Sequence, residues 1–260
     1  MIFESHAHYD DPRYDADREE LLNSFRANGV DYVLNVGADL PSSAESVKLA
    51  AQYDFIYAAV GVHPHDADTL SEDGLHELEK LCGMPKVVAF GEIGLDFFYD
   101  NSPRDIQRHW FRKQLELAER LGLPVIIHSR EAAAETFGII KDSHVRRGVI
   151  HCYSGGVPMA LDYMNMGFYV GVGGVITFEK AKKLIEVVGA VPLERILLET
   201  DAPYLTPAPH RGERNNSNFL PLIASKISEI KGITLQYVYN VTYSSAVKLF
   251  NIDLKGKNHK

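Results

Sequence analysis

The sequence predicts a single-domain α/β protein, a (β/α)8 barrel of the TIM type. Short runs rich in Val and Ile alternate eight times with amphipathic helical stretches. These runs lack strict alternation, as expected for parallel strands that are buried on both faces. The length of 260 residues also matches the roughly 250 residues that such a barrel needs. An open doubly wound sheet is the alternative, but no GxGxxG motif joins a predicted strand to a helix.

The strands are predicted at residues 2–4, 32–36, 56–60, 87–91, 125–127, 148–150, 169–172 and 195–198. Helical patterns are clearest at residues 105–121 and 177–188, and a last helix is predicted at 235–250. Helix starts and ends are marked by prolines and glycines, at Pro41, Pro103 and Pro158 and at Gly29, Gly122 and Gly167. We expect the barrel to cover residues 1–254 and the basic tail 255–260 to be disordered.

Two further segments are predicted to form the mouth of the barrel. The glycine-rich segment 171–174 is interpreted as a tight loop between a strand and a helix. The stretch 200–219, rich in Pro, Asn and Arg, is too long for a simple connection, and loops of that length are usually functional or disordered.

Bulk properties exclude several classes of protein. The formal net charge of -8 argues against a broad basic surface for duplex DNA. Cys82 and Cys152 provide no disulfide framework, and neither a signal-like segment nor a membrane-length apolar stretch is recognisable. We therefore expect a soluble cytoplasmic protein without an obligate protein partner.

Six side chains of metal-ligand type stand at the ends of predicted strands, which is where catalytic groups of this fold lie. They are His6, His8, Glu92, His128, His151 and Asp201. Because residues two apart in a strand point to the same side, His6 and His8 can converge on one ion. Imidazole and carboxylate ligands suit Zn²⁺, and the carboxylates also suit Mn²⁺ or Mg²⁺.

The set exceeds one tetrahedral site, so it predicts a metal-dependent hydrolytic site with two divalent ions. Glu92 is interpreted as the bridge between them, and Asp201 as a ligand that also accepts a proton from metal-bound water. Each residue has a simpler alternative. Glu92 could be a buried carboxylate paired with an arginine, Asp201 could cap the turn before Pro203, and a lone buried histidine is often only a core residue.

The chain resembles the TatD family of metal-dependent deoxyribonucleases, in the amidohydrolase-like barrel superfamily. The resemblance extends over nearly the whole chain and depends on six blocks in family order: residues 5–10 (SHAHYD), 61–65 (GVHPH), 91–96 (GEIGLD), 127–130 (IHSR), 151–155 (HCYSG) and 199–205 (ETDAPYL). It implies hydrolysis of DNA phosphodiester bonds, in some members 3′-to-5′ exonuclease activity, with the same six residues as ligands.

The resemblance also implies residues that contact the substrate. His63 would hold the scissile phosphate or assist the leaving oxygen, although it could be a turn histidine beside Pro64, and His65 could either bind substrate or stabilise its loop. The family segment Pro-x-Arg-Gly-x-x-Asn-Glu-Pro is matched at Arg211 and Asn215, but Asn216 and Ser217 replace Glu-Pro. A guanidinium at Arg211 could clamp phosphate, unless it forms a surface salt bridge.

Five aromatic residues could line the mouth and stack on bases, although core packing is the expected role of at least half of them. They are Phe97, Phe98, Tyr99, Tyr153 and Tyr204. Strand alternation predicts that Cys152 points away from the metal ligands. The resulting hypothesis is a two-metal phosphodiesterase in which metal-bound hydroxide attacks single-stranded or frayed DNA ends. The rival hypothesis keeps the metals and replaces the phosphodiester with an amide, lactone or aminoacyl ester.

Overall fold

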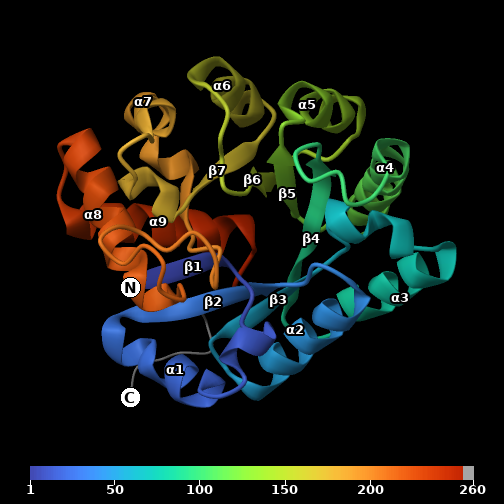
Figure 1. The fold of residues 1–260 in the computed structure, drawn as a ribbon, viewed down its shortest axis with the longest axis horizontal. Helices are drawn as coiled ribbons and strands as arrows, with labels where there is room; N and C mark the ends of the chain where they lie inside the picture. Colours follow the sequence, from blue (N-terminus) through green and yellow to red (C-terminus); the bar gives the residue numbers. More distant parts are fainter. Residues whose placement is uncertain (254–260) are drawn as a thin grey trace.

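The structure is a computed structural model that describes residues 1–253. It confirms the predicted barrel: eight parallel strands form one sheet in the order β1 to β8, with helices around them (Figure 1). The strands are β1 (Ile2–Ala7), β2 (Val30–Val36), β3 (Ile56–Val60), β4 (Val87–Asp96), β5 (Val125–Arg130), β6 (Gly148–Ile150), β7 (Phe168–Val172) and β8 (Ile196–Leu198). The predicted boundary at residue 254 and the tail 255–260 lie outside the described residues.

The helices of the described chain are α1 (Arg18–Ser24), α2 (Leu40–Gln52), α3 (Glu72–Cys82), α4 (Arg104–Leu121), α5 (Ala133–Asp142), α6 (Val157–Asn165), α7 (Lys182–Ala190), α8 (Leu220–Lys231) and α9 (Leu235–Leu249). The predicted last helix is present as α9, which packs back on the barrel and contacts β1 and β8. None of the helices in residues 1–253 is long and apolar enough to cross a membrane.

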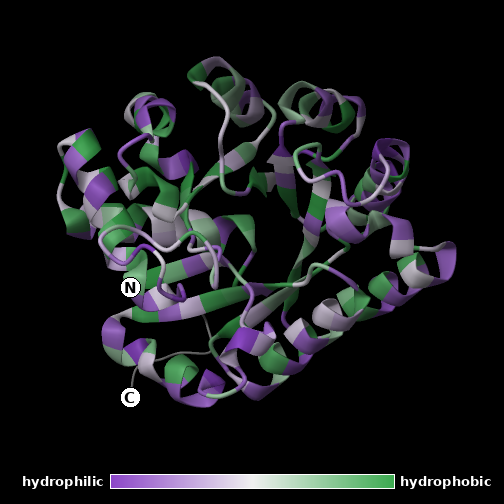
Figure 2. Ribbon diagram, viewed as in Figure 1, coloured by the Kyte–Doolittle hydropathy of each residue, from purple (hydrophilic) through white to green (hydrophobic). Residues whose placement is uncertain are grey.

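The core lies inside the barrel and between the strands and helices. Strands are mainly hydrophobic, whereas the helices carry both hydrophobic and hydrophilic residues (Figure 2). This difference follows from the fold, because a parallel strand is buried on both faces and a surrounding helix on only one. The strand ends are the exception, since they carry buried polar and charged side chains.

Three strands run further than the sequence predicts. β1 continues to Ala7, β4 to Asp96 and β5 to Arg130. β4 and β5 stay paired over this extension, because Gly94 lies opposite His128 and Asp96 opposite Arg130. At Gly94 the backbone φ is +150°, and a Cβ there would lie 1.9 Å from the His128 carbonyl oxygen. Glycine therefore permits the close pairing that places ligand candidates within strands.

The predicted helix starts and ends are largely confirmed. Pro41 and Pro158 stand in the first turns of α2 and α6, Pro103 caps α4, and Gly122 ends α4 with a left-handed backbone. However, α7 begins at Lys182 instead of residue 177. A separate 3-10 turn, Gly174–Thr177, precedes it, because the Thr177 hydroxyl donates to the Gly174 carbonyl (2.7 Å) and accepts the Ala208 N–H (2.8 Å).

Residues that follow β8 close the barrel against β1. Asp201 N–H donates to the His6 carbonyl (3.0 Å), and His8 N–H donates to the Ala202 carbonyl (2.8 Å). A parallel bridge joins Ala7 and Ala202 between them. The seam of the barrel therefore places Asp201 directly beside the two histidines of β1.

Candidate metal centre

The six side chains predicted as ligands meet at the carboxyl ends of the strands. Nε2 of His6 lies 3.1 Å from Nε2 of His8, and the rings of His6 and His151 stack with centroids 3.6 Å apart. His8 Nδ1 is used in a 2.7 Å hydrogen bond with the Val36 carbonyl, which leaves its Nε2 directed at the cluster. His6 and His8 therefore point to the same side of β1, as expected for residues two apart in a strand.

Glu92 lies at the centre of the cluster, on β4. Its Oε2 lies 3.3 Å from Nε2 of His6, and its Oε1 lies 2.8 Å from Nδ1 of His128 and 3.8 Å from Nε2 of His63. Its side chain is 5% exposed. Within residues 1–253 it forms no ion pair with an arginine, which was the simpler alternative for this buried carboxylate.

Asp201 faces the same histidines from the other side of the barrel seam. Its Oδ1 lies 3.5 Å from Nε2 of His8, 3.7 Å from Nε2 of His6 and 3.6 Å from Nε2 of His151. In the described part of the chain its carboxylate accepts no backbone N–H, so the alternative of a turn cap has no support in this geometry.

The donor set fits divalent metal ions. Three groups have ligand atoms that all lie within 4.8 Å of one another: His6, His8 and Glu92; His63, Glu92 and His128; and His6, His151 and Glu199. Imidazole nitrogen and carboxylate oxygen are the ligands that Zn²⁺ and other divalent transition ions prefer. Glu92 belongs to two of the groups, which is the position required of a bridging ligand.

The electrostatics of the cluster favour bound positive charge. Burial alone would raise the pKa of Glu92, but the neighbouring His6 and His151 outweigh it and lower this pKa well below its ordinary value. Burial alone would lower the pKa of His151, but the carboxylates of Glu199 and Glu92 raise it to about 10. The carboxylates therefore hold a proton on His151, and a divalent cation would compete with that proton for the same position.

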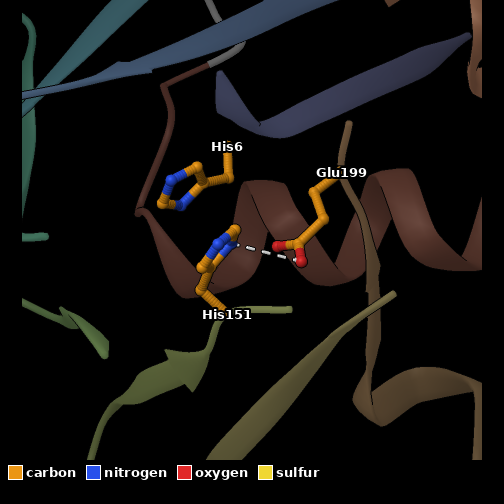
Figure 3. Close-up of side chains that lie close together, drawn as sticks. All are labelled: His6, His151 and Glu199. Carbon is orange, nitrogen blue, oxygen red and sulfur yellow. Dashed lines mark ion pairs between the residues drawn. The ribbon is translucent and has the colours of Figure 1, made fainter. Parts of the chain in front are cut away.

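Glu199 is a buried member of the cluster that sequence reasoning missed. Figure 3 shows its carboxylate beside His151, whose Nδ1 lies 3.3 Å from Glu199 Oε1, while His6 faces His151 on its other side. A carboxylate on the second nitrogen of a ligating histidine fixes the tautomer and orientation of the ring. Glu199 directly follows the last residue of β8, and this position at the carboxyl end of a strand is the signal that could have identified it.

Asp96 is the second missed residue. Its Oδ2 lies 3.1 Å from Nε2 of His128 and 2.9 Å from Nε2 of His65. Burial alone would raise its pKa, but the hydrogen bonds from His128, the Tyr99 N–H and His65 lower it below the ordinary value. Because β4 continues to Asp96, the period of two from Glu92 through residue 94 to Asp96 would have predicted this contact.

His63 links a turn to the cluster. Its Nδ1 accepts the N–H of His65 (3.1 Å), as a turn histidine would, while its Nε2 faces Glu92. Burial lowers its pKa well below the ordinary value, so the ring is neutral near pH 7. In a neutral ring whose Nδ1 accepts a hydrogen bond, the proton is on Nε2, so His63 is a donor directed into the site.

The predicted substrate-contacting residues of the loop after β8 include both exposed and buried side chains. Arg211 is exposed, forms no ion pair within residues 1–253, and lies over the Phe178 ring at 3.8 Å. Tyr204 is 46% exposed, and the guanidinium carbon of Arg13 lies 4.3 Å from the centroid of its ring. Asn215 is fully buried, and its amide donates to the carbonyls of residues 200 and 204. Asn215 thus shapes the loop that carries Tyr204.

The departure from the family segment is accommodated by hydrogen bonds. Asn216 caps a short 3-10 turn, Ser217–Phe219, by accepting the N–H of Asn218 (3.0 Å). The Ser217 hydroxyl lies 2.7 Å from the Tyr9 hydroxyl and donates to Glu4 Oε2 (2.9 Å), and the Ser217 N–H donates to Tyr9 (2.8 Å). A proline at this position could make none of these contacts, so the altered residues attach the loop to β1.

The aromatic residues near the mouth are more exposed than predicted. Phe98, Tyr99 and Tyr204 are exposed by 57%, 54% and 46%, whereas Phe97 is half-buried and Tyr153 is buried. The prediction that core packing accounts for at least half of the five was therefore wrong. β4 ends at Asp96, and the chain beyond it turns outward, where Phe98 and Tyr99 lie under the Arg130 guanidinium.

Cys152 does not follow the predicted strand alternation. β6 ends at Ile150, and Cys152 has a left-handed backbone with φ of 44°. Its N–H donates to Glu199 Oε1 (2.6 Å), and burial followed by the charges of Asp201 and Glu199 raises the pKa of its thiol well above the ordinary value. The premise that alternation orients residue 152 was wrong, because the strand has already ended.

Comparison with known proteins agrees with this geometry. The family described as TatD related DNase matches residues 3–251. The metal-dependent hydrolase YabD of Bacillus subtilis is 41% identical over 97% of this chain and all of its own length. A 3'-5' ssDNA/RNA exonuclease TatD of Cronobacter sakazakii is 35% identical over 92% of this chain and 93% of its own. The crystal structure of YJJV, a TatD homologue from Escherichia coli K12, superposes with a TM-score of 0.92 at 31% identity, covering 97% and 98% of the two chains.

An eight-stranded parallel barrel with buried histidines and carboxylates at its strand ends defines the class of metal-dependent hydrolases with an amidohydrolase-like barrel. Within that class, the match over residues 3–251 and the identity to relatives over nearly their full length show the family. The chain belongs to the TatD family.

Proposed function

We propose that this protein hydrolyses phosphodiester bonds at the ends of single-stranded or frayed DNA, in the 3′-to-5′ direction, at a centre of two divalent metal ions. The observation that carries the proposal is that Glu92 belongs to two ligand groups at once. The name of the Cronobacter sakazakii relative supports the substrate class and the direction. Mg²⁺, Mn²⁺ or Zn²⁺ would be held by His6, His8, Glu92, His128, His151 and Asp201.

Ions in such a pair lower the pKa of bound water and neutralise charge that develops on the phosphate. Asp201 is placed to take up the proton of the attacking water, because its side chain is 17% exposed and those of Glu92 and Glu199 are only 5% and 1% exposed. It is the carboxylate of the cluster that solvent and substrate reach most readily. Glu92 fixes the distance between the two ligand groups.

His63 and Arg211 are assigned to the phosphate. His63 is neutral, with its proton on the nitrogen that faces the cluster, so it can donate to a phosphate oxygen or to the leaving oxygen. Arg211 has no acidic partner in the described residues, so its guanidinium is free to form two hydrogen bonds with a phosphate.

Exposed aromatic rings would hold the bases of the strand. Tyr204 lies on the side of the mouth formed by β1 and the loop after β8, and its ring meets that of His8 edge to face at 6.4 Å. Phe98 and Tyr99 lie after β4, and His65 packs edge to face against Tyr99 at 5.3 Å. Stacking on such rings is tolerant of sequence, as expected for an exonuclease. Asn215 would act indirectly, through the position of Tyr204.

The proposal is tested with labelled single strands whose 3′ ends are free or blocked, incubated with the purified protein and Mg²⁺, Mn²⁺ or Zn²⁺. We expect stepwise shortening of the free-ended strand alone. Glu92→Ala should reduce the rate by at least about 10²-fold and lower the bound metal measured by mass spectrometry.

Glu77→Ala is the matched control, because Glu77 is an exposed residue of α3 without an ion pair in the described chain. Equal activity of the wild type and the Glu92 variant would refute the two-metal mechanism. Turnover of a lactone, amide or aminoacyl ester without any cleavage of DNA would keep the metal centre and reassign the bond.

A further inference from the structure

A pocket beside the metal-ligand cluster has no role in the mechanism above. It has a volume of about 220 Å³ and lies between the loop after β6 and the segment that joins β7 to α7. We call it the β6–β7 pocket; its lining includes Cys152, Tyr153, Ser154, Val175, Lys180 and Lys183. This volume is large enough for several waters, which suits one small ligand unit such as a nucleobase with its sugar edge.

The inner wall of the pocket is continuous with the metal-ligand cluster. Cys152 directly follows His151, and its N–H donates to Glu199, the carboxylate that holds His151. Gly171 lines the pocket on the other side of Glu199, where a Cβ would lie 2.2 Å from Glu199 Oε2. Residues that line the pocket therefore contact Glu199, which in turn contacts the ligand candidate His151.

The rim of the pocket carries positive charge without acidic partners. Lys180 and Lys183 are both exposed, and neither forms an ion pair within residues 1–253. Other surface lysines, such as Lys48, Lys113 and Lys226, each lie within 4 Å of a carboxylate. In a chain with a net charge of -8, two neighbouring uncompensated lysines form a local site for an anion. One wall is the loop after β7, which frequently takes part in phosphate binding in barrels of this class.

The rest of the lining is apolar. Val175, Ala181 and Leu184 form one side, and the buried ring of Tyr153 is held in place by its hydroxyl, which donates to the Gly156 carbonyl at 2.8 Å. An inorganic anion would leave this apolar surface unused. The combination of an apolar wall and a cationic rim fits a ligand with a flat apolar part and a phosphate.

We propose that the β6–β7 pocket binds one nucleotide of the substrate strand, next to the scissile phosphate, with its base against the apolar wall and its own phosphate between Lys180 and Lys183. This inference rests on the proposed function. It adds a subsite that determines affinity for nucleic acid but takes no part in bond cleavage.

The test measures binding and chemistry separately on the metal-loaded protein. Fluorescence anisotropy of a labelled single-stranded phosphorothioate oligonucleotide, which resists cleavage, reports binding at the pocket. Hydrolysis of bis(4-nitrophenyl) phosphate, a phosphodiester without a flanking nucleotide, reports the metal centre. We expect the double variant Lys180→Gln with Lys183→Gln to weaken oligonucleotide binding about tenfold and to flatten the slope of log affinity against log salt by about 0.7, the value for one phosphate contact on a single strand.

Lys182→Gln is the matched control, because Lys182 is an exposed lysine of the same segment that does not line the pocket. It should leave both the affinity and the salt slope close to those of the wild type. None of these variants should change kcat/KM for bis(4-nitrophenyl) phosphate. Ser154→Trp places a large side chain on the rim from an exposed position, and it should weaken oligonucleotide binding at every salt concentration.

Equal affinity and equal salt slope of the double variant and Lys182→Gln would overturn the subsite, even if the protein cleaves DNA. Conversely, selective loss of binding in the double variant would support the subsite even if DNA were bound and not cleaved. Failure of the subsite and failure of the proposed reaction are therefore distinguishable.

Discussion

The metal-ligand cluster and the loop after β8 lie against each other at the mouth of the barrel, but different kinds of contact hold them. The cluster is positioned by strand register: β4 and β5 remain paired through Gly94 and His128, and the barrel seam places Asp201 beside β1. The loop, residues 202–219, is positioned by side chains that reach backbone groups far away in sequence, as Tyr14 does in donating to the Asn215 carbonyl (2.5 Å).

The comparison indicates how the two parts can change. A ligand on a strand cannot shift without shifting its neighbours in the sheet, so the chemistry of the centre is robust to changes elsewhere. The loop depends on a few side-chain contacts, so a substitution such as Ser217 for proline can be accommodated by new hydrogen bonds to Glu4 and Tyr9. The loop is thus the part of the mouth in which substrate preference can vary.

The largest expected effect is on metal affinity. It concerns Glu199, which belongs to the metal-ligand cluster. Glu199→Gln keeps the size of the side chain but removes the charge that orients His151. Loss of such a carboxylate typically costs 10- to 100-fold in metal affinity, so we expect a weakening of that size in competition titrations of Mn²⁺ or Zn²⁺ against a chelator.

Glu194→Gln is the control for this change, because Glu194 is exposed and lies just before β8. It should leave the metal affinity unchanged. If Glu199→Gln also leaves it unchanged, the orientation of His151 depends on the fold alone, and Glu199 has no share in the centre.

The difference between the strand-borne cluster and the loop also explains how much of the site could be predicted from the sequence. The pairing of His6 with His8 was predictable, because a strand repeats every two residues. The same rule would have found Asp96, had β4 been predicted to continue beyond residue 91. Strand periodicity acts over neighbouring residues, and the sequence displays it directly.

The contacts of the loop were not predictable in this way. Ser217 meets Glu4 across 213 positions of sequence, and only the closure of the barrel brings them together. The burial of Asn215 likewise depends on where the loop folds back, which no local pattern encodes. For Cys152 the local rule itself was applied wrongly, because this residue lies two positions beyond the end of β6.

The next largest expected effect is on the stability of the protein. It concerns Ser217 in the loop after β8. Ser217→Pro restores the proline of the family segment, and the first position of a 3-10 turn tolerates its backbone. It removes the hydrogen bonds to Glu4 and Tyr9, both fully buried, so we expect the free energy of unfolding in urea to fall by about 2 kcal/mol.

Ser217→Ala is the matched control, since it removes the hydroxyl and retains the N–H that donates to Tyr9. It should destabilise the protein by less than the proline variant. Both variants should retain the metal affinity of the wild type, because the centre depends on the strands. A loss of metal affinity equal to that of Glu199→Gln would remove the distinction between the two regions.

The smallest expected effect is on KM, and it should differ between two arginines of the loop after β8. Arg211 has no acidic partner in the described chain, whereas Arg214 forms an ion pair with Asp17, and the shorter of their two hydrogen bonds is 2.5 Å. We expect Arg211→Gln to raise KM for single-stranded DNA about threefold, because one phosphate contact is lost, without a change in stability. Arg214→Gln should leave KM unchanged and lower the free energy of unfolding by at most about 1 kcal/mol, since the pair is partly exposed to solvent. Steady-state kinetics and urea unfolding of the two variants check the expected KM and the expected stability. A KM increase of equal size in both variants would mean that Arg211 also acts by holding the loop.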